Sequence, residues 1–390
     1  MTTAQTHAGV ARADVVGSLL RPGYLWEARQ ALREGRITEA ELRAVEDRAV
    51  REAIALQEAA GLDMISDGEM RRTSWIASIP LVGEDPSFTA PVTGYSFFDD
   101  AGQGWIRGWR DSEGKAVQRP PRPRAIVTEK LRPRRDIVAG EYGFLKKHAR
   151  GRTKYTFPAP SYHRVFWHPE HSRAAYPTVD DFLADVREYI RTEVIERLIA
   201  LSCDYIQMDA PNYGQFYTDP EVRAEFEAEG HDLDANLIAD AEIDNSVFEG
   251  VGGVTRALHV CRGNGPGGIW SAAGGYDTLA PAMFPRLRNV DTLLLEYDTP
   301  RAGDFSPLRH VLPHTTVVLG LLTTKSGALE DAATVERRVG EAAQYVPLER
   351  LALSPQCGFN SARAGNPLTP AEQEAKLRLV ATVARRLWDS

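Results

Sequence analysis

Short apolar runs alternate with longer helical patterns along most of the chain, and this alternation limits the fold more than any other feature. Most of the runs are apolar at consecutive positions, as strands of a parallel sheet covered on both faces are. Eight runs have the length of such strands: 13–17, 62–66, 154–157, 204–208, 254–260, 292–296, 316–320 and 350–354. Eight strands with interleaved helices predict an α/β protein with a (β/α)8 TIM barrel, ahead of the alternative of an open α/β sheet.

Four stretches between these runs have helical patterns: 38–60, 178–201, 329–345 and 369–388. Thr38 and Glu41 stand at the spacing of a capping box, so a helix is predicted to begin directly after Thr38.

The chain has 390 residues, which one barrel with insertions accounts for, so a single catalytic domain is predicted over residues 1–390. The net charge of −8 argues against a nucleic-acid partner. Three cysteines indicate a reducing compartment rather than a disulfide framework. No signal peptide and no run of about 18 apolar residues is visible, so we expect a cytoplasmic protein with no membrane partner.

Residues 95–135 interrupt the alternation. Aromatic and polar residues alternate from Trp105 to Trp109, and a turn signal follows at 111–114, which predicts a β-hairpin excursion after the second strand. A basic, proline-rich link follows at 119–124. We interpret the excursion as a contact in a possible homodimer, and the alternative is a lid over the barrel mouth.

Residues that can bind a soft metal ion collect where three predicted strands end. His259 and Cys261 are two residues apart on one strand, so their side chains point to the same side. Glu296 closes the strand at 292–296, and Cys357 follows the strand at 350–354. One imidazole, one carboxylate and two thiolates could close a single zinc site at the carboxyl-terminal mouth of a barrel, where chemistry takes place in this fold.

A packing interpretation of the same residues stands beside the zinc site. A His-x-Cys pair is short enough to arise by chance, and a buried cysteine often acts as a small apolar side chain. From these residues alone the two interpretations are evenly supported. Cys203 has no comparable neighbours, and we interpret it as a packing residue.

Other predicted strand ends also carry polar residues: Gly17 and Ser18, Glu69, Asp209 and Lys325. Each has an ordinary structural explanation, since Ser18 and Asp209 can cap the segments that follow and Glu69 can pair with Arg71 or Arg72. From these residues alone the structural explanations are preferred.

These motifs together resemble the cobalamin-independent methionine synthase family in its short, single-barrel form. The resemblance extends from Val16 to Trp388, and three long stretches carry it: 259–264, 295–305 and 353–359. It implies a zinc site of His259, Cys261, Glu296 and Cys357, and thiol-substrate contacts from Ser18, Glu69 and Asp209. In such a site Glu69 and Asp209 suit a substrate ammonium group, and Ser18 with the Gly17 backbone could hold a carboxylate.

The function that the resemblance implies is zinc-dependent transfer of a methyl group to a thiol, with homocysteine as the expected thiol and methionine as the product. Zinc lowers the pKa of a bound thiol, and an electron-rich site keeps the sulfur nucleophilic. Glu296 is the one oxygen ligand beside two sulfurs, so it is the ligand that we expect a substrate thiol to displace.

Departures from the family pattern leave the methyl donor open. Full-length members carry an additional barrel that helps to hold polyglutamylated folate, and this chain has no room for it. The family's Asp-Glu-Pro is Asp209-Ala210-Pro211 here, and Lys325 stands where long members place a histidine that delivers a proton. The donor could be a folate, a corrinoid-type compound or a partner protein.

Two other functions fit the same ligand pattern. Relatives that open epoxides with a thiol cofactor share the His-x-Cys and Cys motifs, and such an enzyme would not require Glu69 or Asp209. A barrel with a structural zinc and no catalytic role is the third hypothesis.

Overall fold

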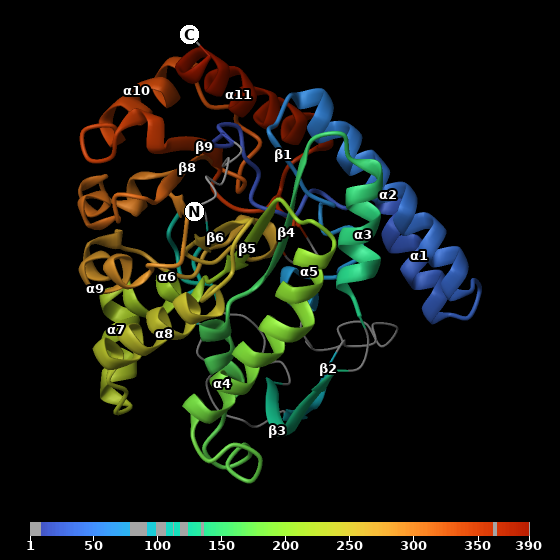
Figure 1. Cartoon of the computed structure of the whole chain (residues 1–390), viewed down its shortest axis with the longest axis vertical. Helices are drawn as coiled ribbons and strands as arrows, with labels where there is room; N and C mark the ends of the chain where they lie inside the picture. Colours follow the sequence, from blue (N-terminus) through green and yellow to red (C-terminus); the bar gives the residue numbers. More distant parts are fainter. Residues whose placement is uncertain are drawn as a thin grey trace, which may run out of the picture.

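The computed structural model describes residues 9–78, 92–98, 107–111, 113–117, 124–133, 136–361 and 365–389. Its centre is a curled parallel sheet of seven strands in the order β1-β4-β5-β6-β7-β8-β9 (Figure 1). The strands are β1 Met64–Ile65, β4 Arg152–Pro158, β5 Tyr205–Asp209, β6 Thr255–Val260, β7 Thr292–Glu296, β8 Thr316–Leu322 and β9 Leu351–Pro355. Seven of the eight predicted strands are therefore confirmed, and their order along the sheet follows the sequence.

The strand predicted at 13–17 is wrong as a strand. Only Ala13 forms a parallel bridge, which it makes with Leu353 of β9. On the other side, the Ala13 carbonyl accepts a hydrogen bond from the Asp63 N–H at 2.9 Å, next to β1. The segment thus lies between the two edges of the sheet without forming a ladder with either.

Side chains from the sheet and from the residue after β1 donate hydrogen bonds to the backbone carbonyl groups of this segment. Lys154 Nζ donates to the Val15 carbonyl at 2.6 Å, Gln207 Nε2 donates to the Val16 carbonyl at 2.9 Å, and Ser66 Oγ donates to the Gly17 carbonyl at 2.9 Å.

Helices lie around the sheet (Figure 1). They are α1 Gly23–Arg33, α2 Glu39–Ala60, α3 Val138–His148, α4 Val179–Tyr189, α5 Glu196–Ala200, α6 Asn212–Tyr217, α7 Pro220–Ala228, α8 Leu233–Val247, α9 Ala280–Met283, α10 Ala332–Ala342 and α11 Pro370–Trp388. The capping box predicted at the start of α2 is confirmed, since Thr38 Oγ1 accepts from the Glu41 N–H and Glu41 accepts from the Thr38 N–H. None of the helices in the described ranges combines the length and apolar character of a membrane span.

The excursion predicted at 95–135 is described only in parts. Strands β2 Val92–Phe98 and β3 Arg124–Pro133 pair antiparallel as a separate two-stranded sheet. Between them, Arg110 forms antiparallel bridges with Ala116 and with Trp270. Trp105, Ile106 and the link at 119–123 lie outside the described residues, so the hairpin centred on 105–114 and its role as dimer contact or lid stay predictions.

Alternation along the strands separates an inner face of the sheet from an outer one. A small apolar cluster fills the inner face: Ala11, Val16, Met64, Tyr205, Ala257, Leu294, Val318 and Ala352. Two residues further along β6 and β7, on the same face, stand His259 and Glu296. The sheet therefore places an apolar floor directly beneath the polar residues at its carboxyl ends.

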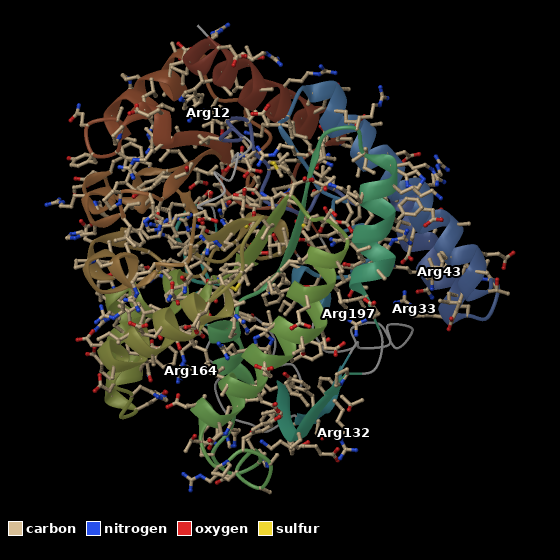
Figure 2. All side chains as sticks on the ribbon, in the orientation of Figure 1. Arg12, Arg33, Arg43, Arg132, Arg164 and Arg197 are labelled. Carbon is tan, nitrogen blue, oxygen red and sulfur yellow. The ribbon has the colours of Figure 1, made fainter. Side chains whose placement is uncertain are left out.

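Charged side chains mostly point outward from this framework. Arg43 and Arg132 are exposed at the periphery, whereas Arg164 is buried and pairs with Asp240 at 2.6 Å (Figure 2). A charged side chain can be buried in a protein interior when it is paired with an opposite charge, and Glu296 at the candidate site is paired with Arg301 in this way.

Candidate metal centre

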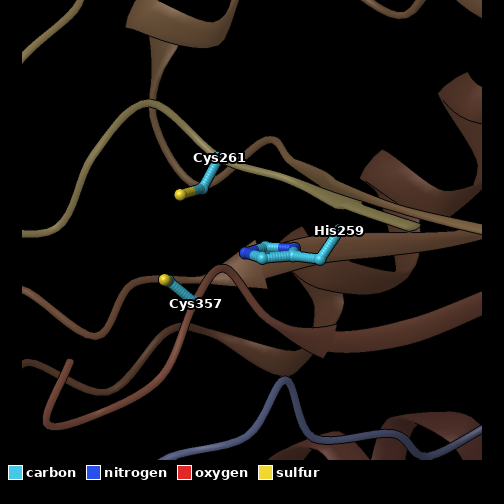
Figure 3. Close-up of side chains that lie close together, drawn as sticks. All are labelled: His259, Cys261 and Cys357. Atoms are coloured by element: carbon cyan, nitrogen blue, oxygen red, sulfur yellow. The ribbon is translucent and has the colours of Figure 1, made fainter. Parts of the chain in front are cut away.

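One imidazole and two thiols meet at the carboxyl ends of β6 and β9 (Figure 3). His259 belongs to β6, Cys261 follows that strand by one residue, and Cys357 follows β9. Their ligand atoms all lie within 4.8 Å of one another, and all three side chains are buried. The structure therefore brings together three of the four metal ligands that the sequence predicts.

The His259 ring is held in an orientation suited to binding a metal. Its Nδ1 lies 3.2 Å from the Leu294 carbonyl, which can only accept, so this nitrogen carries the proton. The other nitrogen, Nε2, is buried and has no hydrogen-bond partner among the described residues. The ring points toward the two sulfur atoms (Figure 3). A histidine that donates one N–H to a carbonyl and leaves the other nitrogen free is the usual arrangement of a metal ligand.

The two thiols interact closely. A hydrogen bond from the Cys261 thiol lowers the pKa of Cys357 well below its ordinary value, although burial acts in the opposite direction. The neighbouring His259 favours the same thiolate, and the positive charge of Lys325 adds to this effect. Both cysteines are free of disulfides. A pair of reduced thiols that shares one proton readily exchanges it for a metal ion, because thiolates are the binding form.

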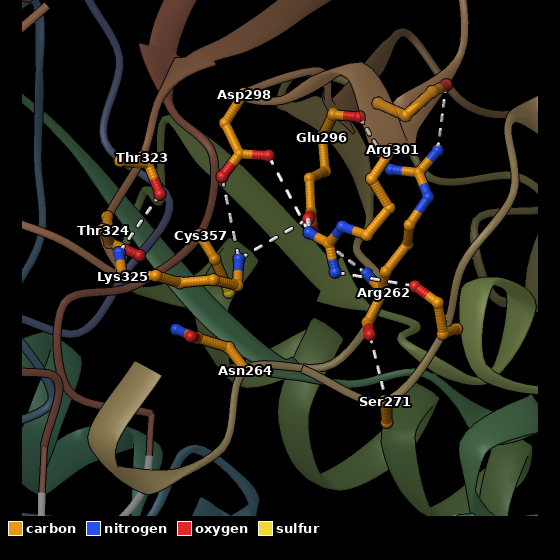
Figure 4. A network of polar contacts seen from close by, with 12 residues as sticks. Arg262, Asn264, Ser271, Glu296, Asp298, Arg301, Thr323, Thr324, Lys325 and Cys357 are labelled. Atoms are coloured by element: carbon orange, nitrogen blue, oxygen red, sulfur yellow. Dashed lines mark hydrogen bonds and ion pairs between the residues drawn. The ribbon is translucent and has the colours of Figure 1, made fainter. Parts of the chain in front are cut away.

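Glu296 lies outside the group of three and has other partners (Figure 4). Its Oε1 pairs with Arg301 and lies 3.5 Å from Lys325 Nζ, and its Oε2 accepts from the Arg262 N–H at 2.9 Å. Burial would raise the pKa of this carboxyl group, but the nearby cations, led by Lys325, hold the pKa at about 2. Glu296 is therefore a charged carboxylate beside the cluster, and its role as a ligand stays a prediction.

Lys325 lies where the sequence predicts it, at the mouth. Its ammonium group is 3.5 Å from Glu296 Oε1 and 3.8 Å from Asp298 Oδ2 (Figure 4). The Asp298 side chain is fully buried, and the described residues give neither of its oxygens a hydrogen bond. Lys325 thus links the end of β8 to two carboxylates at the end of β7.

Glu69 follows β1 and is buried. Its Oε1 accepts a hydrogen bond from Thr156 Oγ1 at 3.2 Å, while its Oε2 has no hydrogen-bond partner in the described structure. Arg21 and Arg72 approach the two oxygens at 3.7 and 3.8 Å. Burial raises the pKa of Glu69 to about 7, although these two arginines act to lower it.

Gly17 and Ser18 pack against Glu69 and against the chain after β9. A Cβ atom on Gly17 would lie 2.9 Å from Glu69 Oε1, so a larger residue there would displace the end of the Glu69 side chain from its present place. Ser18 Oγ accepts from the Asn360 N–H at 3.3 Å, and the Ser18 carbonyl accepts from the Phe359 N–H at 2.8 Å. Gly17 and Ser18 therefore connect Glu69, which follows β1, to the residues after β9, where Cys357 lies.

Asp209 closes β5 and is a direct neighbour of His259 in the register of β5 and β6. Its Oδ1 accepts a hydrogen bond from Gln207 Nε2 at 2.7 Å. Burial raises the pKa of Asp209 to about 6, and the charges on Glu69 and Asp209 disfavour each other. Two buried carboxylates that repel each other form a place where a cation is stabilised.

From the sequence, no site role was predicted for Thr156, Gln207, Asp298 or Arg301. Gln207 and Asp298 each stand two residues from a predicted site residue, on the same face of the chain, so strand alternation could have found them. Arg301 follows Glu296 by five residues and pairs with it within one loop, whereas Thr156 reaches Glu69 through a contact between distant segments, which no local pattern predicts.

A thiophilic metal ion fits this donor set. His259 Nε2 is free to bind, the two thiols are reduced, and all three donors are within reach of one point. Imidazole with two thiolates is a set typical of zinc, with a fourth position left for a carboxylate or a substrate. Beside it, Glu69 and Asp209 provide negative charge for a ligand that carries both a soft donor and a cationic group.

The chain is similar to known proteins along nearly its whole length. No protein-family model matches it. The protein YxjH of Bacillus subtilis (strain 168), described as uncharacterized, is 34% identical over 382 residues, which cover 97% of this chain and 94% of the relative. A methionine synthase of Pyrococcus horikoshii is 25% identical over 350 residues, which cover 89% of this chain and 85% of the relative.

A solved structure supports the fold. The B12-independent methionine synthase of Shewanella sp. W3-18-1, determined in complex with selenomethionine, superposes with a TM-score of 0.68 at 18% identity and covers 97% of this chain and 98% of that one. At this identity the likeness shows the fold alone. Taken with the relatives that match by sequence and the ligand motifs at the strand ends, it confirms the resemblance, and the chain belongs to the cobalamin-independent methionine synthase family.

Proposed function

We propose that this protein transfers a methyl group to the thiol of homocysteine to give methionine, and that it does so with a zinc ion. The observation that carries the proposal is the buried group of His259, Cys261 and Cys357 beside two buried carboxylates. A thiol donor set next to an ammonium-binding environment matches a substrate that is both a thiol and an amino acid.

Zinc held by His259, Cys261 and Cys357, with Glu296 as the fourth ligand, would lower the pKa of a bound thiol and keep its sulfur nucleophilic. The floor of apolar residues below the site would exclude water from it. Glu296 has partners of its own in Arg301 and Lys325, so its carboxylate can leave a ligand position without becoming an unpaired buried charge.

The amino-acid part of the substrate is assigned to the other strand ends. Glu69 and Asp209 would bind the ammonium group, since Glu69 Oε2 is buried and lacks a hydrogen-bond donor within the described ranges. Ser18 and the backbone at Gly17 would hold the carboxylate. With its ammonium and carboxylate groups held, homocysteine would extend its side chain toward the cysteine and histidine ligands.

Lys325 is proposed as the catalytic group that faces the methyl donor. Its ammonium group would present N–H donors to the atom that the methyl group leaves, in a position fixed by Glu296 and Asp298. A methylated folate is the donor that we propose first, since a relative that is 32% identical over 106 residues is named 5-methyltetrahydropteroyltriglutamate–homocysteine methyltransferase.

We also propose that the sheet closes into a complete (β/α)8 barrel, with the segment at 13–17 at its seam. The contacts of Ala13 with Leu353 on one side and with Asp63 on the other support this closure. A closed barrel would place the seven strand ends and the end of the segment at 13–17 around one mouth.

A donor panel tests the proposed function. The zinc-loaded protein is incubated with homocysteine and, in turn, with a methylated folate, a methylcorrinoid and an epoxide, and mass spectrometry detects the products. Methionine formed from one of the methyl donors is the expected result. An alkylated thiol formed only from the epoxide would favour the thiol alkyltransferase alternative, and no product from any donor would favour the non-catalytic zinc barrel.

A further inference from the structure

We propose that Thr156 is a positioning residue whose hydroxyl group fixes the Glu69 carboxylate. Through this contact the protein selects thiols that carry an α-amino group over thiols that lack one. The inference rests on the proposed function, in which Glu69 binds the substrate ammonium. It concerns a residue that touches Glu69 rather than the substrate.

The direction of the hydrogen bonds around Thr156 is determined by its neighbours. Arg72 Nη1 lies 3.2 Å from Thr156 Oγ1, and a guanidinium can only donate. The hydroxyl oxygen therefore accepts from Arg72, and its own hydrogen is directed to Glu69 Oε1 at 3.2 Å. The chain of donors ends on the carboxylate, which favours its charged form.

Arg72 is itself held in place from α3. Its Nε and Nη2 donate to Glu141 Oε2 at 3.1 and 2.8 Å, and the Tyr155 hydroxyl donates to the same oxygen at 2.9 Å. Arg72, Tyr155 and Glu141 are all buried. Because its guanidinium is fixed by this anchor, Arg72 presents Nη1 to Thr156 in one position.

The backbone conformation of Glu69 and the facing residue Gly17 also restrict the position of the Glu69 side chain. Glu69 adopts a left-handed backbone conformation with φ of 57°, which side chains rarely occupy. Gly17 leaves room for its Oε1, because a Cβ atom there would stand 2.9 Å away. Strained residues that several contacts hold in place are typical of functional sites.

The result is a carboxylate with one oxygen engaged and one oxygen available. Oε1 has the Thr156 hydroxyl, whereas Oε2 is buried with no hydrogen bond from the described residues. Arg21 and Arg72 face the group with positive charge, and Asp67 and Asp209 face it with negative charge. A substrate ammonium would supply the donor that Oε2 lacks.

The test compares two thiols of equal length in the zinc-loaded protein. Homocysteine and 4-mercaptobutanoic acid differ only in the amino group, and calorimetry gives their dissociation constants. Thr156→Val removes the hydroxyl and keeps the shape, whereas Thr156→Ser keeps the hydroxyl. We expect Thr156→Val to weaken homocysteine binding about tenfold and to change binding of the other thiol less than about twofold, with Thr156→Ser near the parent.

Three results would overturn the inference. Equal weakening of both thiols would mean that Thr156 acts only through the general packing of β4. Unchanged homocysteine binding in Thr156→Val would remove its role in positioning Glu69 while leaving the proposed function intact. A parent protein that binds both thiols equally would overturn the proposed function as well. Thr156→Ala, which also lacks the hydroxyl, replaces Thr156→Val if that variant does not fold.

Discussion

The three cysteines differ in what surrounds them. Cys261 and Cys357 lie within reach of the free His259 nitrogen, whereas the Cys203 thiol donates to the Tyr205 carbonyl at 3.3 Å and burial raises the pKa of that thiol to about 11. We predict about one zinc ion per chain in the parent protein. Cys261→Ser and Cys357→Ser should each weaken zinc binding at least about tenfold, because a hydroxyl is a poor ligand for zinc.

Cys203→Ser is the matched control for this measurement. Zinc content, determined by elemental analysis after dialysis against a weak chelator, should stay at the parental level in that variant. An equal loss of zinc from all three variants would show that the ligand assignment is wrong.

Glu69 gives the site a dependence on pH. Burial raises the pKa of its carboxyl group to about 7, and a bound ammonium group needs the ionised form. The ionised fraction rises as pH rises through 7, so binding must tighten in that direction. Methionine, which has no thiol to titrate, should bind about five- to tenfold more tightly at pH 7.5 than at pH 6.

Calorimetric titrations of methionine at several pH values check this prediction. Glu69→Gln should bind more weakly and lose most of the dependence on pH. Binding to the parent that stays constant or weakens from pH 6 to pH 7.5 contradicts the assignment of Glu69 to the amino group.

The predictable part of the site is the part that follows local rules. His259 and Cys261 could be predicted as neighbours because residues two apart on a strand point to one side. Thr156 could not, since its contact with Glu69 depends on how distant segments pack. Glu296 lies outside the group of three, where Arg301 and Lys325 pair with it.

At the scale of elements, the buried ion pair between Lys154 and Asp14 holds the segment at 13–17 against β4. The two charged groups are 2.8 Å apart, both side chains are fully buried, and Lys154 Nζ also donates to the Val15 carbonyl. Lys154→Met leaves the Asp14 charge unpaired in the interior. We predict a loss of about 3–5 kcal/mol in the free energy of unfolding, measured by urea denaturation.

Two variants serve as controls for this measurement. Arg337→Met breaks the exposed pair of Arg337 and Glu341 at 2.8 Å and should leave the free energy of unfolding nearly unchanged. The double variant Asp14→Asn with Lys154→Met removes both charges and should regain part of the loss. Destabilisation of equal size by Arg337→Met and Lys154→Met would contradict the role given to the buried pair.

Seven strands were predictable because each is a short apolar run that matches the burial of a parallel sheet. The segment at 13–17 has the same composition but not the same structure. The side chains of Lys154, Gln207 and Ser66 take its carbonyl groups, and no pattern within the segment could indicate that. The helical stretch at 178–201 was likewise predicted without its π-helical turn at Ile190–Ile195.

At the scale of the whole molecule, a single curled sheet brings a soft donor set and two buried carboxylates to the same end. The relatives that match over most of the chain place it in the cobalamin-independent methionine synthase family, and we propose that Ala210 and Lys325 affect the choice of methyl donor. We propose that the substrate sulfur joins His259, Cys261 and Cys357 on one zinc ion.

X-ray absorption spectroscopy of the zinc-loaded protein tests this claim most directly. The metal should have the sulfurs of Cys261 and Cys357 as neighbours before the substrate is added, and one further sulfur after saturation with homocysteine. The same change should occur with a Cys203→Ser variant, whose sulfur we place away from the metal. A zinc shell that keeps only the two cysteine sulfurs with saturating homocysteine would contradict the account and leave zinc with a structural role.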